Sequence, residues 1–207
     1  MNPRAESAPR LWRQLQLVAQ AVQGVREGRS LAAQLEQVEP ALRPGVQALS
    51  FHALRWLGTA EVLRRALARR APPPAVDALL CTALALAQPE PDALYEPFTL
   101  VNQTVEAARR QPALRVQSAF INACLRRFLR ERAALMATAL QDPVARWNHP
   151  RWWVERLKRD HPGHWQAILA AAQQPAPMDL RVNLQRTSVE AFSADLARHG
   201  LQADVLG

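Results

Sequence analysis

The sequence has few of the residues that build disulfides, metal sites and nucleotide-binding loops. It has two cysteines in 207 residues, Cys81 and Cys124. Each lies in an apolar helical pattern, so we expect buried free thiols rather than a disulfide framework or a zinc site. Seven glycines leave little material for a glycine-rich turn that would bind a nucleotide cofactor. We therefore expect no metal site and no cofactor site in this chain.

Long apolar runs are also missing. The first ten residues, MNPRAESAPR, have no apolar core that could serve as a signal peptide, and no run is long enough to cross a bilayer. This predicts a soluble cytoplasmic protein without a membrane partner. Three histidines, His149, His161 and His164, have no carboxylate or cysteine at a metal-ligand spacing, and we expect them to be structural or solvent-exposed.

Arginine, in contrast, is abundant. The formal net charge is +8 and the sequence pI is about 11.2, and Lys158 is the one lysine among the 26 basic residues. A basic surface gains free energy from counterion release when it meets phosphates, so nucleic acid is the first candidate partner. Arginine excess beside abundant alanine is also typical of coding bias, so the charge supports RNA binding without proving it.

Apolar spacing predicts an all-α first domain of six or seven helices up to about Leu140. The proline run 72–74 marks a junction between two helical subdomains, and residues 77–87 are apolar nearly all round, as in a central helix. The other expected helices run from Arg10 to a stop at Gly28, from an N-cap at Ser30 to Pro40, from Pro44 to Arg70 with Gly58 as a point of bending or splitting, from about Phe98 to Gln111, and from Ser118 onward.

The segment 118–132, SAFINACLRRFLRER, has two contrasting faces. At about 100° per residue, its apolar side chains fall on one half of the helix and Arg126, Arg127 and Arg130 on the other. Such a face can meet an anion, or it can be an ordinary solvated face of a core helix. Trp12 likewise lies off the apolar stripe of the first helix, where it can stack on a base or cover the edge of the core.

Two stretches in order resemble NusB-type RNA-binding domains. Residues 120–127, FINACLRR, are similar to that family's last-helix pattern, and residues 100–110, LVNQTVEAARR, resemble a preceding motif in which Gln103 replaces an acidic residue. The resemblance implies a NusB-like RNA-binding bundle over residues 1–142. On it we predict phosphate contacts from arginines of the first helix and of these two motifs: Arg10, Arg13, Arg109, Arg110, Arg115, Arg126, Arg127 and Arg130.

The character of the sequence changes after residue 142. Asn148, His149 and Pro150, followed by Trp152 and Trp153, resemble the linker of Sun-type (RsmB) 16S rRNA cytosine-C5 methyltransferases, and residues 180–183, LRVN, match a later motif. This resemblance implies a helical linker at 143–177 and, at 178–207, the truncated start of a ferredoxin-like or RRM-like subdomain. There we expect a strand at 178–185, a helix to about 199 opened by a capping box of Thr187 and Glu190, and a second strand at 201–206.

The resemblance implies the RNA-binding N-terminal region of an S-adenosylmethionine-dependent methyltransferase. That region would position small-subunit rRNA for a catalytic domain that is absent from this chain. The family's two cysteines occur in Pro-Cys-Ser and Thr-Cys-Ser contexts, neither of which is present here, so we assign no catalytic residue. One alternative is a NusB-like antitermination factor that binds RNA and a ribosomal protein, and it would not need the stretch after residue 142. Another is a helical protein-interaction module.

We predict that the purified chain transfers no methyl group by itself. Methylation of cytosine C5 needs a reactive thiolate that adds to C6 and a bound methyl donor. The measurement is incorporation of labelled methyl groups from S-adenosylmethionine into unmodified small-subunit rRNA, compared with a reaction without protein. Turnover above that background would contradict the prediction.

Overall fold

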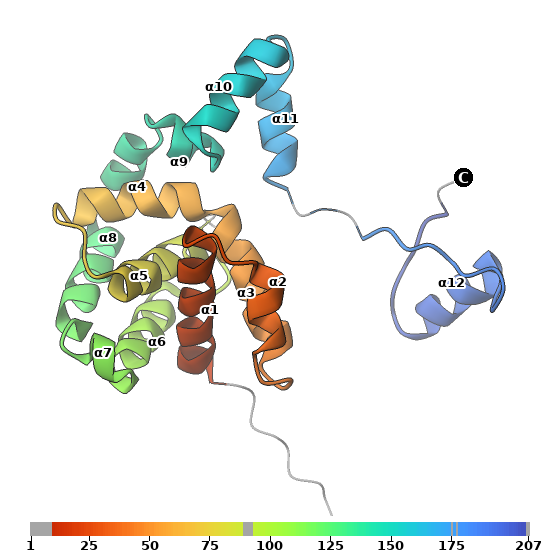
Figure 1. Ribbon diagram of the computed structural model, residues 1–207, viewed down its shortest axis with the longest axis horizontal. Coiled ribbons are helices and arrows are strands. Elements are labelled where there is room, and N and C mark those ends of the chain that lie inside the picture. Colours follow the sequence, from red (N-terminus) through yellow and green to blue (C-terminus); the bar gives the residue numbers. More distant parts are fainter. Residues whose placement is uncertain (1–9, 89–92, 175, 177, 206–207) are drawn as a thin grey trace, which may run out of the picture. The chain divides into compact units, whose positions relative to one another are not determined.

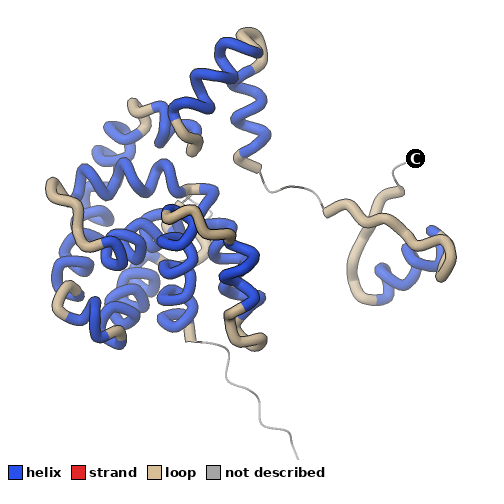
Figure 2. The backbone as a smooth tube through the Cα atoms, viewed as in Figure 1, coloured by secondary structure: helices blue, strands red, loops and turns tan. Residues whose placement is uncertain are grey.

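The computed structural model describes residues 10–88, 93–174, 176 and 178–205. Within these ranges the chain forms twelve α-helices and no strand (Figure 2), so the mainly all-α prediction is confirmed. Of the features considered in the sequence, residues 1–9 and Leu206, the last residue of the second expected strand, lie outside the described ranges. The chain divides into two compact units, one up to Gln173 and one from Gln174 onward.

The first unit contains eleven helices within the described ranges (Figure 1). They are α1 (Leu11–Arg26), α2 (Leu31–Glu36), α3 (Arg43–Arg55), α4 (Leu57–Leu67), α5 (Pro74–Leu86), α6 (Pro97–Arg110), α7 (Pro112–Arg115), α8 (Ser118–Ala139), α9 (Pro143–Trp147), α10 (Arg151–Asp160) and α11 (Trp165–Ala172). The described part of the chain has no helix long and apolar enough to cross a membrane.

Helix α5 lies at the centre of this unit. Every residue from Ala78 to Leu86 is buried, because a helix that is apolar on all sides is stable only when other elements cover all of them. Helices α1, α3, α4, α6 and α8 all pack against it. The prediction of a central helix here is confirmed.

The surrounding helices each bury one stripe. In α1 the residues Leu15, Val18 and Val22 are fully buried, as the spacing of its apolar residues predicts. In α8 the buried side is formed by Ile121, Cys124, Leu125 and Phe128, which confirms the apolar face expected for this segment. Arg13 of α1 and Arg126 and Arg130 of α8 are exposed on the other sides of these helices.

A group of charged side chains ties α1 and α4 to the start of α5. The Asp77 carboxylate accepts from Arg26 Nη1 at 2.8 Å and pairs with Arg64 Nε at 2.6 Å. Arg26 also pairs with Glu61 at 2.9 Å. These side chains are largely buried, and Asp77 is only 15% exposed. Since partly buried charges are tolerated only when paired, Asp77 compensates Arg64 and, together with Glu61, compensates Arg26.

The long helix expected from Pro44 to Arg70 is two helices. They separate at Trp56, whose backbone leaves the helical region, two residues before the expected break at Gly58. Gly58 has another role, because α9 passes so close that a Cβ atom there would lie 2.5 Å from the carbonyl oxygen of Val144. Asn148, which ends α9 in the left-handed conformation, accepts a hydrogen bond from the Thr59 amide at 2.8 Å and so caps α4 from outside.

Helices α10 and α11 form a hairpin with a small core of its own. Val154, Leu157 and Leu169 are buried there, and Trp147, Trp153 and Trp165 pack around them. The hairpin is tied to the bundle at its far end, where Gln173 Nε2 donates to the Arg55 carbonyl at 2.9 Å. The predicted domain boundary at 142/143 therefore lies between helices that remain in one compact unit.

The second unit contains the helix α12 (Val189–Arg198), which confirms the helix predicted after residue 187. Its N-cap is Ser188, whose hydroxyl accepts from the Ala191 amide at 3.2 Å, so the predicted Thr187 and Glu190 capping box is wrong by one position. The described residues of 178–205 form no strand, contrary to expectation. Strands are defined by pairing, and neither candidate segment is paired with a neighbour here.

We predict that Asp77→Asn lowers the free energy of unfolding by about 3 kcal/mol, because it leaves two largely buried guanidinium groups without their shared partner. The matched control is Glu39→Gln, which breaks an ion pair to Arg13 whose two side chains are 53% exposed and should cost less than about 1 kcal/mol. Urea unfolding followed by circular dichroism measures both. Equal losses in the two variants would show that the Asp77 cluster adds no special stability.

Candidate nucleic-acid interface

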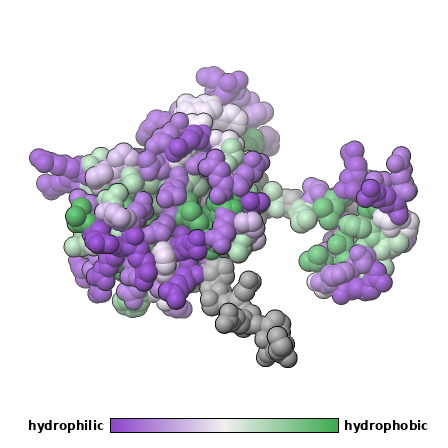
Figure 3. Space-filling view, turned by 60° about the horizontal axis from the view of Figure 1, so that its bottom comes forward, coloured by the Kyte–Doolittle hydropathy of each residue, from purple (hydrophilic) through white to green (hydrophobic). Residues whose placement is uncertain are grey.

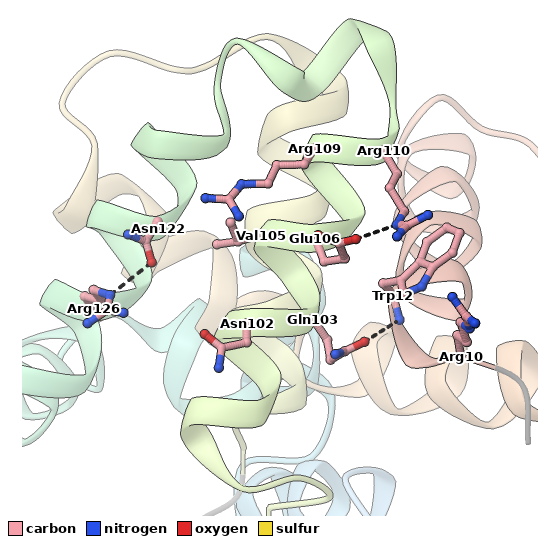
Figure 4. Close-up of a pocket in the computed structure, with 10 residues that line it drawn as sticks. All are labelled: Arg10, Trp12, Asn102, Gln103, Val105, Glu106, Arg109, Arg110, Asn122 and Arg126. Carbon is pink, nitrogen blue, oxygen red and sulfur yellow. Dashed lines mark hydrogen bonds and ion pairs between the residues drawn. The ribbon is translucent and has the colours of Figure 1, made fainter.

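A hollow of about 630 Å³ opens where α1, α6 and α8 meet (Figure 4). The start of α1 contributes Arg10 and Trp12, and α8 contributes Asn122 and Arg126. The outer side of α6 provides the remaining lining residues, which are Asn102, Gln103, Val105, Glu106, Arg109 and Arg110.

Two hydrogen bonds hold α1 beside α6 at this hollow. The Trp12 amide donates to Gln103 Oε1 at 3.2 Å, and Gln16 Nε2 donates to the Ala107 carbonyl at 2.8 Å. Gln103 is the residue that departs from the acidic position of the NusB-type motif. Its amide oxygen still accepts a hydrogen bond here without adding a negative charge to the hollow.

The α8 side of the hollow follows from helix spacing. Asn122 and Arg126 are four residues apart and so neighbour each other on one face, and Arg126 Nε donates to Asn122 Oδ1 at 3.0 Å. Ile121 and Leu125 anchor the opposite side of α8 in the core. The arginine is therefore held at the surface by a neutral amide, which leaves its positive charge uncompensated.

Four arginines line the hollow, and they differ in their partners. Arg110 pairs with Glu106, and its guanidinium lies 4.6 Å from the centre of the Trp12 ring. Arg10, Arg109 and Arg126 have no acidic partner among the described residues. One carboxylate thus faces four guanidinium groups, and the hollow carries an excess of positive charge.

The other four arginines predicted to contact phosphate lie outside the hollow. Arg13 pairs with Glu39 at 2.7 Å, and Arg115 Nε donates to the Arg109 carbonyl at 3.1 Å. Arg127 and Arg130 share Glu131, at 2.9 and 3.5 Å. The sequence grouped Arg126, Arg127 and Arg130 on one face; of these three, Arg126 lines the hollow, and Arg127 and Arg130 pair with Glu131.

Sequence reasoning did not select the polar residues that complete the hollow. Asn102 and Asn122 lie in the two motifs but were not counted as site residues. Their signal was their place on the outer side of helices whose other side is buried. Trp12 packs partly against the core, as one of the two roles considered for it requires, and it also lines the hollow; stacking on a base stays a prediction.

Neither cysteine belongs to this hollow. Cys81 and Cys124 are free and buried, as predicted. Burial raises the pKa of the Cys81 thiol to about 11, and it also raises the pKa of Cys124. A thiol with a raised pKa is a poor nucleophile near neutral pH. The hollow itself is lined by cations, amides and an indole ring, and neither thiol supplies it with a covalent catalyst.

Known proteins resemble almost the whole of this chain. Residues 149–206 match the family model of the ferredoxin-like domain of RsmF/B-like methyltransferases. Proteins named ribosomal RNA small subunit methyltransferase B are 34% identical in Pseudomonas putida and 31% identical in Pseudomonas syringae pv. tomato. Each of these alignments covers 98% of this chain, and 45% and 44% of the relative respectively. The protein of that name in Xylella fastidiosa is 35% identical over 86% of this chain and 41% of its own length.

This chain spans less than half the length of these curated relatives. The two longest alignments nevertheless run through both motifs, the Asn-His-Pro linker and the stretch after it. The resemblance seen in the sequence is therefore confirmed beyond residue 142, in the region that an antitermination factor would not need. Over almost its whole length, the chain is therefore similar to the Sun-type (RsmB) ribosomal RNA small subunit methyltransferases.

Proposed function

We propose that this chain binds ribosomal RNA through the hollow between α1, α6 and α8, and positions it for methylation. The relatives are named for methylation of small-subunit ribosomal RNA, and the same RNA is the partner proposed here. Transfer of a methyl group from S-adenosylmethionine to cytosine C5 of 16S rRNA is proposed for the whole protein. We place it in the cytoplasm, where such an RNA substrate is available.

The observation that supports this proposal is that Arg10, Arg109 and Arg126 line one hollow without an acidic partner among the described residues. Like charges that share a hollow repel one another, and a bound anion would relieve that repulsion. Phosphate suits this role because the planar guanidinium fork pairs with its oxygens in two parallel hydrogen bonds.

The pairing of other arginines supports the choice of this surface. Arg26 and Arg64 are neutralised within the bundle by Asp77, and Arg127 is neutralised at the surface by Glu131. An RNA that approached those positions would have to compete with a carboxylate already in place. Among the described residues, Arg110 is the one arginine of the hollow with such a competitor.

Backbone phosphates are the expected contacts of these arginines. The site is an open hollow rather than a closed cavity, and guanidinium groups on separate helices can follow a phosphate chain. Contacts of this kind position a nucleic acid without reading its sequence, and they make the affinity strongly dependent on salt.

We predict that the double variant Arg109→Gln, Arg126→Gln binds an rRNA fragment more weakly and with a flatter salt dependence. Each lost phosphate contact reduces the slope of log affinity against log salt by about 0.7 to 0.9, so the slope should fall by about 1.5. Fluorescence anisotropy with a labelled small-subunit rRNA fragment at several salt concentrations measures the slope.

The matched control is Arg127→Gln, Arg130→Gln. It also removes two positive charges, but both come from positions on α8 that lie outside the hollow. Its salt slope should stay within experimental error of the wild-type slope. Circular dichroism confirms that both double variants remain folded. If both lower the slope equally, RNA binding depends on total charge and the hollow is not the site; if neither does, these arginines do not contact RNA.

A further inference from the structure

We infer that the hollow accepts unpaired RNA, with one base stacked on Phe98 at the beginning of α6. This inference rests on the proposed RNA-binding function and adds the class of RNA that the surface takes. It is carried by an aromatic ring that has no role in the core and by its place on the same face of α6 as the hollow.

Phe98 is 72% exposed, which makes it the most exposed of the five phenylalanines of this chain. Phe128, in comparison, is fully buried in the bundle core. A large ring held in water loses the free energy that burial would supply. Phe98 is also not among the partly buried residues that pack against the core, so the stability of the bundle does not explain its presence.

Helix geometry places Phe98 in line with the hollow. Asn102 follows it by four residues and Arg109 by eleven, which at about 100° per residue puts all three within an arc of about 40°. Asn102 and Arg109 both line the hollow. At a rise of about 1.5 Å per residue, Phe98 lies roughly 6 Å along α6 from Asn102. The exposed ring therefore extends the lined face of α6 by one helical turn.

An aromatic ring beside a track of cations is the arrangement with which proteins bind single-stranded nucleic acid. Arginines follow the backbone while bases stack on the rings, and stacking tolerates any sequence. Duplex RNA hides the faces of its bases and presents mainly backbone and groove edges. Phe98 would gain little from a duplex, whereas an unpaired base could cover its ring.

The polar lining of the hollow fits the same class of ligand. Asn102 is exposed, and its side chain has no hydrogen-bond partner among the described residues. Its carboxamide carries both donors and an acceptor, so it can pair with the edge of a base that is not already paired. The Trp12 ring offers a second aromatic surface in the hollow, with the Arg110 guanidinium over it.

The test compares one RNA in two states. A labelled strand of roughly 12 nucleotides is titrated with the full chain, once alone and once annealed to its complement, at the same salt concentration. We expect the wild-type chain to bind the unpaired strand about tenfold more tightly. Phe98→Ala should remove most of that difference by weakening binding of the unpaired strand, with a change of less than about twofold for the duplex.

Three further variants separate stacking from general apolar contact. Phe98→Tyr should keep the preference for the unpaired strand, since its ring still stacks, and Phe98→Leu should lose it. Phe51→Ala is the matched control, because Phe51 is another exposed phenylalanine but lies on α3, outside the hollow. It should leave both affinities unchanged.

The outcomes distinguish this inference from the function on which it rests. Equal affinity for both states, or an unchanged preference in Phe98→Ala, overturns the inference and leaves RNA binding by the hollow in place. Wild-type affinity for the unpaired strand in Phe98→Leu would show an apolar contact rather than stacking, and would overturn it too. Absence of binding to either RNA overturns both proposals.

Discussion

The need to bury α5 on every side determines the arrangement of the bundle. An ordinary amphipathic helix needs cover on one side, whereas each residue of α5 from Ala78 to Leu86 must be shielded from water. Five other helices supply that shield, and each contributes one apolar stripe and leaves its polar side outside. The charged group around Asp77 then attaches the beginning of α5 to α1 and α4.

The proposed RNA surface is a consequence of this packing. Helices α1 and α6 lie next to each other because both pack on α5, and α8 packs along α6. Their outer sides border one hollow, which Arg10, Arg109 and Arg126 line from three helices (Figure 4). In the space-filling view, hydrophilic side chains cover much of the visible face of the bundle, with hydrophobic ones between them (Figure 3). Positive charge alone therefore does not single out a site; what marks the hollow is that three of its four lining arginines have no acidic partner among the described residues.

The distinction between paired and unpaired arginines separates structural from functional candidates. Arg26 and Arg64 are held by Asp77 and stabilise the bundle. Arg127 and Arg130 share one glutamate at the surface, where a pair contributes little to stability and also weakens attraction for a further anion. The arginines without acidic partners keep their full field available to a polyanion, which is why we place the RNA on them.

Local regularities in the sequence determined much of this protein. They indicated the helices, their buried stripes, the central position of α5, the buried thiols and the resemblance to the RsmB family. These depend on helical periodicity or on short motifs, which neighbouring residues define among themselves. Only the tertiary structure decided which four of the eight predicted arginines share a hollow, and why Gly58 must be a glycine. Both depend on side chains from distant helices, as with Glu131 beside Arg127 and α9 against Gly58. The strands expected after residue 178 were not found among the described residues for the same reason, because a strand requires a partner that local sequence does not supply.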